Sequence, residues 1–255
     1  MREPPRVMVS PTGARRQKSD VPGIPLTVPE IAAEAAACQR AGADAIHLHV
    51  RDGAGAHSLD AGLYREAIAA VEAAAPGLEI QITTESAGRF DVADQLRCLR
   101  DVQPAQASAG LREILRDRAL AVEFYGFAAE AGIRVQHILY ELEDVARLRA
   151  AYSQGLIAPD KREAIFVLGK YAPPTTGRPI DLAPLLQAAG DLALDWMVCA
   201  FGPQELVCLT EAMRQGGHAR VGFENNIHLP DGSVADSNAQ LVALVAEARA
   251  DLTEE

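Results

Sequence analysis

The chain has 255 residues, of which 49% are hydrophobic and 23% charged, and its formal net charge is −11. This composition is typical of a globular protein and excludes an intrinsically disordered chain. The negative charge disfavours nucleic acids and anionic membranes as partners, because both require a basic surface. The four cysteines show no CxxC spacing, and the first residues lack the apolar core of a signal peptide. We therefore expect a reduced, cytoplasmic protein without a membrane span.

Short apolar runs alternate with helical patterns from one end of the chain to the other. We expect strands at residues 6–10, 45–50, 78–84, 105–110, 133–141, 163–169, 192–201 and 219–226. We expect helices at residues 28–42, 59–75, 91–102, 119–132, 142–153, 180–189, 203–217 and 237–250. Strict alternation indicates an α/β protein with a parallel sheet. Eight such units in this length predict a single (β/α)8 TIM barrel over residues 1–255.

The second predicted strand carries two histidines, His47 and His49, in the run AIHLHVRD. Successive side chains of a strand point to opposite faces, so these two imidazoles and Arg51 share one face. Two imidazoles on one face can bind Zn²⁺. The alternative is a pair of hydrogen-bonded core histidines, and a third ligand is needed to decide between the two interpretations.

Polar side chains at the ends of the other strands are the next candidates, because the site of a TIM barrel lies at the carboxyl ends of its strands. By parity, Arg220 and Glu224 share a face of the last strand. They form either a structural ion pair, or Glu224 completes a His₂Glu site with an open fourth position, which is the pattern of catalytic zinc. The remaining candidates at strand ends are Thr83, Thr84, Glu85, Ser108 and Asn225.

Several segments resemble the β-keto acid cleavage enzyme family, in the right order along nearly the whole chain. The pair HLHVR and RVGFEN is its most distinctive part. The matching segments are TGA (12–14), GADAIHLHVRD (42–52), IQITT (80–84), FVLG (166–169), GGHARVGFENN (216–226) and ADSNAQLVALV (235–245).

The resemblance implies a homo-oligomeric TIM barrel, a tetramer, with one catalytic Zn²⁺ per chain held by His47, His49 and Glu224. It implies a transferase reaction that exchanges acyl groups between a β-keto acid and acetyl-CoA, giving acetoacetate and a new acyl-CoA. The metal would act as a Lewis acid on the keto acid. Arg220 and Thr83 match the family's catalytic arginine and hydroxyl residue. Arg51, Thr84 and Ser108 are predicted to bind the substrate.

The chain departs from the family at positions that bear on the reaction. Asn225 stands where the family has a catalytic acid, and an amide cannot accept a proton as a base does. Arg15 stands where the family has an acidic residue in the first loop. The loss of negative charge favours a substrate without a cationic tail, with an anionic group met by Arg15 or Arg16; the alternative is a solvated loop. Glu85 could supply the missing carboxylate, or it could cap a turn.

Two other functions remain open on this scaffold. One is a zinc-dependent lyase or hydrolase whose chemistry is altered by Asn225, and the other is a non-catalytic, metal-dependent binder of keto acids. Of the other histidines, His228 follows the last strand near the metal end, where it either contacts the substrate or has a loop role. We expect His57 to be exposed in a loop, His137 to pack outwards against a helix, and His218 to make a structural hydrogen bond.

Overall fold

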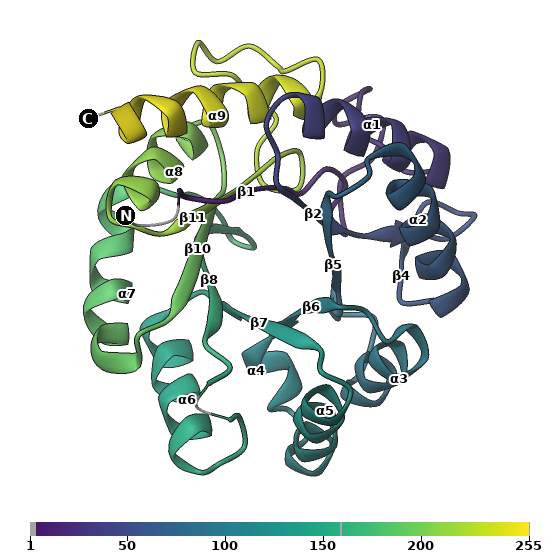
Figure 1. The fold of residues 1–255 in the computed structure, drawn as a ribbon, viewed down its shortest axis with the longest axis vertical. Helices are drawn as coiled ribbons and strands as arrows, with labels where there is room; N and C mark the ends of the chain where they lie inside the picture. The colour runs from purple at the N-terminus through teal and green to yellow at the C-terminus, as the bar shows by residue number, and fades with distance from the viewer. Residues whose placement is uncertain (1–3, 159, 255) are drawn as a thin grey trace.

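Parallel strands pair side by side into a closed barrel in the computed structural model, which describes residues 4–158 and 160–254 (Figure 1). The barrel strands are β1 (Val7–Val9), β2 (Ala45–Leu48), β5 (Glu79–Thr83), β6 (Gln106–Gly110), β7 (Arg134–Leu139), β8 (Glu163–Tyr171), β10 (Asp195–Ala200) and β11 (His218–Val221). They follow one another round the barrel in chain order, and β10 pairs with both β8 and β11. The predicted (β/α)8 barrel is confirmed.

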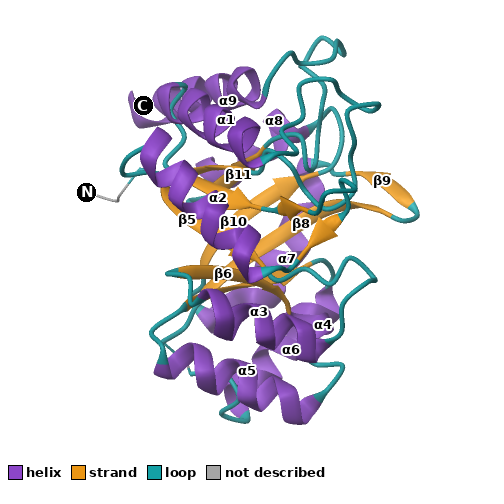
Figure 2. Cartoon of the chain, turned by 90° about the vertical axis from the view of Figure 1, so that its right-hand side faces the viewer, coloured by secondary structure: helices purple, strands orange, loops and turns teal. Residues whose placement is uncertain are grey.

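Helices surround the barrel on the outside (Figures 1 and 2). They are α1 (Val28–Arg40), α2 (Ala61–Ala74), α3 (Val92–Val102), α4 (Leu111–Ile114), α5 (Arg118–Glu130), α6 (Leu142–Ser153), α7 (Leu182–Ala189), α8 (Glu205–Arg214) and α9 (Asn238–Glu254), with 3₁₀ turns η1 (Pro179–Asp181) and η2 (Gly190–Leu192). Local signals start several of them. Thr27 and Glu30 form a capping box at α1, and the Asp60 side chain accepts a hydrogen bond from Leu63 N at α2.

Alternating side chains of each strand divide the core into two layers. Val7 and Val9 of β1 belong to the large apolar layer between the barrel and its helices. Met8, which lies between them in the sequence, belongs instead to the smaller cluster that includes Ile165 and Met197. The period of two therefore places polar and apolar residues together inside the barrel, where the candidate site residues also lie.

Two short hairpins were not expected from the sequence. The predicted second strand ends at Leu48, and β3 (Val50–Arg51) then pairs in antiparallel fashion with β4 (His57–Ser58). The strand β8 continues into β9 (Pro174–Thr176), which projects beyond the barrel in Figure 2.

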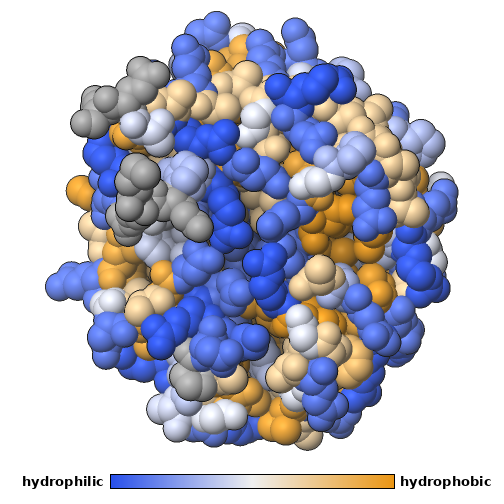
Figure 3. Space-filling view, in the orientation of Figure 1, coloured by the Kyte–Doolittle hydropathy of each residue, from blue (hydrophilic) through white to orange (hydrophobic). Residues whose placement is uncertain are grey.

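Figure 3 shows hydrophilic side chains gathered over the middle of the barrel in the view of Figure 1. Of the helices in the described residues, none is long and apolar enough to cross a membrane.

The last predicted strand was too long: β11 ends at Val221, and the next residues form a turn that carries Glu224. Gly222 has φ of +139°, a conformation that side-chain-bearing residues rarely adopt. A Cβ on Gly222 would lie 2.7 Å from Ser10 O and 2.8 Å from Asn238 Oδ1. The turn can therefore approach β1 only because this residue is glycine.

Replacing Gly222 with alanine is expected to lower the free energy of unfolding by more than about 1 kcal/mol, because the new methyl group meets backbone and the φ angle is strained. Gly126 provides the control. It lies exposed in the middle of α5 with no heavy atom within 4 Å of an added Cβ. Gly126→Ala should raise stability by about 0.5–1 kcal/mol. Urea unfolding of both variants measures this contrast, and equal effects would contradict it.

Candidate metal centre

Two imidazoles and one carboxylate converge at the carboxyl ends of β2 and β11. One ligand atom from each of His47, His49 and Glu224 can be chosen so that all lie within 4.8 Å of one another, and all three residues are buried. His47 Nε2 lies 3.2 Å from His49 Nε2, and Glu224 Oε2 lies 3.7 Å and 3.5 Å from these two nitrogens. The structure therefore brings together the three residues that the sequence predicted as metal ligands.

The charge of Glu224 is balanced mainly by Arg220. Burial opposes ionisation of this carboxyl, but Arg220 and the two histidines outweigh it and hold the pKa of Glu224 well below its usual value. Arg220 Nη2 lies 3.4 Å from Glu224 Oε1, and Arg220 is itself 3% exposed. The predicted ion pair and the three residues of the predicted metal site are thus found together, because the two carboxylate oxygens face different partners.

The donor set fits a divalent metal ion. Within the described part of the chain, Glu224 Oε2 and His49 Nδ1 are buried atoms without a hydrogen-bond partner. Burial, followed by the charge of Arg220, holds the pKa of His47 below its usual value, so this imidazole is neutral and retains a lone pair. Two imidazoles and one carboxylate are the ligand set of catalytic zinc sites that keep an open position.

His57 was expected to be exposed, and this prediction was wrong. It is 2% exposed because the β3–β4 hairpin folds over the site. The centre of its ring lies 5.2 Å from that of His49, with the two rings tilted by 51°, and its Nε2 donates to Glu85 O at 2.9 Å. Burial lowers the pKa of His57 to about 3. His57 is therefore a neutral, buried group that lies between the loop after β5 and His49.

The hydroxyl residues of β5 and β6 form one buried cluster. Thr83 Oγ1 accepts hydrogen bonds from Glu85 N at 3.0 Å and from Ser108 Oγ at 3.5 Å. Thr84 Oγ1 donates to Ser108 O at 2.9 Å. Glu85 lies in the loop after β5, and burial raises the pKa of its carboxyl above the usual value. Its Oε1 lies 3.8 Å from Arg15 Nη2.

The first loop is held in place by Arg51. Its guanidinium donates to Gly13 O, Gly55 O, Arg16 O and Thr12 O at 2.9–3.4 Å. These bonds leave Arg51 little capacity to bind a substrate, and they position the loop that carries Arg15. The Arg15 side chain is about half exposed, and its guanidinium carbon lies 5.2 Å from the centre of the Tyr171 ring. Tyr171 in turn donates to Glu224 O.

The turn that presents Glu224 depends on residues that the sequence did not single out. Glu205 is buried at the start of α8, where it accepts from Gly222 N at 3.2 Å and from Asn226 Nδ2 at 3.2 Å. Burial raises the pKa of Glu205 to about 8. Phe223 N donates to Asn238 Oδ1 at 2.7 Å. Asn225 is 1% exposed, and its Oδ1 has no hydrogen-bond partner in the described residues.

His137 and His218 have the structural roles expected for them. His137 is buried, its ring lies 5.6 Å from that of Tyr125 on α5, and its Nδ1 bonds to Glu163 O. His218 bonds to Asp195 through Nε2 and accepts from Arg6 N through Nδ1.

The fold and the site place this chain among the TIM-barrel proteins with a candidate metal centre. Its parallel strands close into a barrel, and a His₂Glu cluster lies at their carboxyl ends. The model of the beta-keto acid cleavage enzyme family matches residues 6–255. The chain belongs to this family.

The names of two similar proteins agree with this family assignment. The chain is 28% identical over 251 residues to "3-keto-5-aminohexanoate cleavage enzyme" of Fusobacterium nucleatum, covering 95% of this chain and 90% of that protein. It is 27% identical to "3-oxoadipate:acetyl-CoA acetyltransferase" of Cupriavidus necator, with coverage of 96% and 88%. The solved "Ternary complex of ObcA with C4-CoA adduct and oxalate" shares the fold, with a TM-score of 0.67 at 17% identity, covering 89% of this chain and 63% of that one.

The raised pKa of Glu205 predicts a dependence of stability on pH. A carboxyl whose pKa is about 8 when folded and 4.5 in its usual state binds its proton more tightly when folded. Its contribution is complete below pH 4.5 and is lost as the pH rises through 8. Urea unfolding between pH 5 and 9 should show wild-type stability falling relative to that of Glu205→Gln. A constant difference between the two proteins across this range would contradict the assignment.

Proposed function

We propose that this chain is a zinc-dependent enzyme that exchanges acyl groups between a β-keto acid and acetyl-CoA. The bond between C2 and C3 of the keto acid breaks, the acetyl group joins the two-carbon fragment as acetoacetate, and the released acyl group leaves as its CoA thioester. The observation that carries the proposal is the convergence of His47, His49 and Glu224 in one buried cluster. The name of the Cupriavidus relative, an acetyl-CoA acetyltransferase, supports the same class of reaction.

In this proposal, His47, His49 and Glu224 hold one divalent ion per chain. That ion, when bound, supplies Lewis-acid polarisation of the keto acid's oxygens. Arg220 keeps Glu224 ionised and adds positive charge beside the substrate. The hydroxyls of Thr83, Thr84 and Ser108 border the same end of the barrel and orient the substrate.

Glu85 is the proposed base that takes a proton from C2 of the keto acid. Asn225 cannot accept that proton, since its side chain is an amide. Glu85 lies in the loop after β5, close enough to His49 and Glu224 for both to affect the pKa of its carboxyl in addition to burial. Its raised pKa makes it a stronger base than an exposed carboxylate, and Arg15 at 3.8 Å stabilises its charged form.

Arg15 is the proposed contact for an anionic group at the far end of the substrate. It lies on the first loop, about half exposed above Tyr171. Arg51 holds this loop through main-chain carbonyls, so its contribution to substrate binding is indirect. The Cupriavidus relative is named for 3-oxoadipate, a dicarboxylic acid, which agrees with a cationic residue at this place.

Metal analysis tests the centre itself. The purified protein should contain about one zinc per chain, and His47→Ala should lose it, because a two-ligand site retains zinc poorly. His218→Ala is the control, since this histidine bonds to Asp195 at 2.9 Å, away from the cluster. If the wild type stays free of metal after zinc is supplied, or if both variants lose metal equally, the proposed centre is wrong.

Glu85→Gln should lower turnover about 100-fold or more, because a general base contributes two to four powers of ten. Glu85→Asp should keep part of the activity, and both variants should retain metal. Wild-type turnover should rise with pH through a pKa above the ordinary glutamate value, in line with the effect of burial. Steady-state rates with a β-keto dicarboxylic acid measure this. Full activity of Glu85→Gln with metal in place would exclude Glu85 as the base.

Asn225 supports a second candidate, a zinc-dependent lyase or hydrolase on the same scaffold. An enzyme that exchanges acyl groups consumes acetyl-CoA in step with the keto acid. A hydrolase or lyase consumes the keto acid alone. Product analysis with and without acetyl-CoA separates them, and metal binding without turnover of any β-keto acid would leave only a binder.

A further inference from the structure

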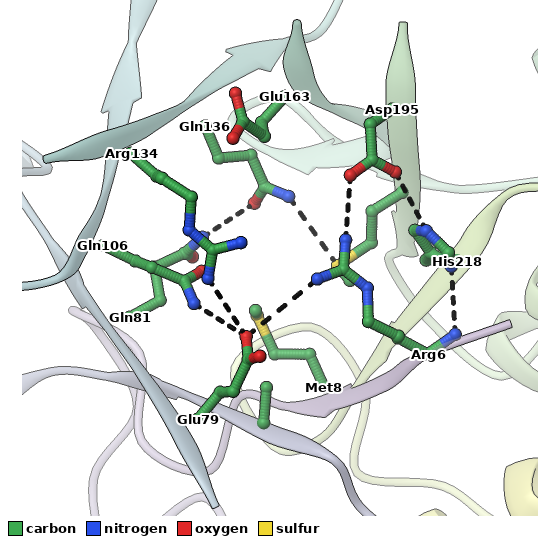
Figure 4. A pocket seen from close by; sticks show the side chains of 12 residues that line it. Arg6, Met8, Glu79, Gln81, Gln106, Arg134, Gln136, Glu163, Asp195 and His218 are labelled. Carbon is green, nitrogen blue, oxygen red and sulfur yellow. Dashed lines mark hydrogen bonds and ion pairs between the residues drawn. The ribbon is translucent and has the colours of Figure 1, made fainter. Parts of the chain in front are cut away.

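Gln81 lies inside the barrel, between the candidate metal centre and the opposite end of the strands. It stands on β5 beside His47 on β2, as paired residues of neighbouring strands, and it is 2% exposed. Its Oε1 lies 2.8 Å from His47 Nδ1. Its Nε2 donates to Gln136 Oε1 at 3.3 Å, and Gln136 Nε2 points to Met197 Sδ at 3.9 Å. Figure 4 shows the two glutamines facing each other across the barrel interior.

Gln81, Gln136 and Met197 thus form a row of side chains that leads to His47. The chemistry of these groups fixes the direction in which the hydrogen bonds of this row run. A thioether sulfur can accept a hydrogen bond but cannot donate one. The amide nitrogen of Gln136 therefore faces Met197, which leaves its oxygen for Gln81. The amide nitrogen of Gln81 is thereby engaged, so its oxygen faces His47. Since an amide oxygen only accepts, the proton of the neutral His47 ring is on Nδ1.

This arrangement leaves the lone pair of His47 on Nε2. That nitrogen is the one directed at His49 Nε2, 3.2 Å away, and at Glu224 Oε2, 3.7 Å away. A histidine ligand whose other nitrogen donates to a fixed acceptor is held in the correct tautomer and ring orientation. The row from Met197 to Gln81 can do this for His47 from inside the barrel.

Charged side chains border the barrel interior beyond this row. Glu79 accepts from Gln106 at 2.7 Å and pairs with Arg134 at 3.3 Å, while Arg6 pairs with Asp195 at 2.9 Å (Figure 4). The cavity that they border together with Gln81 and Gln136 has a volume of only about 20 Å³. Gln81 and His47 are 2% and 1% exposed, so their hydrogen bond acts in a medium of low dielectric, where it is stronger.

We propose that Gln81 is a positioning residue for the metal centre: it fixes His47 with Nδ1 protonated and Nε2 free, and its own orientation is fixed by Gln136 and Met197. This inference rests on the proposed metal centre for its purpose. The tautomer of His47 is a property of the protein without metal, and it can be tested separately.

Three variants separate this role from packing. Gln81→Met keeps the side-chain length and removes the acceptor, whereas Gln81→Glu keeps an acceptor. Gln106→Met is the matched control, because Gln106 pairs with Gln81 in the neighbouring strand but bonds to Glu79 instead of His47. Competition with a chromogenic chelator measures Zn²⁺ affinity. Gln81→Met should bind Zn²⁺ about 10–100-fold more weakly, while Gln81→Glu and Gln106→Met stay close to the wild type.

Nitrogen NMR of the metal-free wild type gives the second readout. His47 should show a single tautomer with its proton on Nδ1, and Gln81→Met should lose this preference while Gln106→Met keeps it. A wild-type proton on Nε2, unchanged Zn²⁺ affinity in Gln81→Met, or an equal loss in Gln106→Met would overturn the proposal. If the wild type binds no zinc, the metal centre fails, and the tautomer alone still decides the role of Gln81.

Discussion

The structure depends on one buried carboxylate. Glu224 is 6% exposed, and an unpaired charge at such a depth would be strongly destabilising. Arg220 compensates one oxygen at 3.4 Å, and the other oxygen faces the two imidazoles. The protein thus balances the charge of this side chain on one side and directs the other side at the two candidate metal ligands. The remaining features of the site hold this arrangement in position.

Most of the fold could be predicted from the sequence because its signals are local. The capping box of Thr27 and Glu30 and the alternation of apolar runs with helical patterns act over a few residues. That His47 and His49 lie side by side could also be predicted, since they are two residues apart. The parity argument for Glu224 was wrong in its premise, because β11 ends before it. The side chains of Arg220 and Glu224 nevertheless meet, because the turn that begins at Gly222 brings Glu224 back towards Arg220.

The supporting residues could not be predicted, because their partners lie far away in the sequence. Glu205 and Asn238 bond to the turn from α8 and from the start of α9. Gln81 is an ordinary inward-facing residue of a strand until its partner across the sheet is known to be His47. His57 was assigned to an exposed loop because a two-residue strand leaves almost no periodic signal, and pairing with Arg51 buries it.

The two ends of the barrel differ in character, and the row of Gln81, Gln136 and Met197 lies between them. The exposed ion pairs of Arg6, Glu79 and Arg134 contribute little to stability individually, because water screens them. Their position matters more than their strength, since they cover the barrel interior below Gln81 and Gln136. Gln81 and Gln136, the two amides of the row, are 2% and 8% exposed above this end of the barrel. In the proposed metal centre at the other end, Glu224 and His47 can bind the same ion only if His47 directs its lone pair at the side of Glu224.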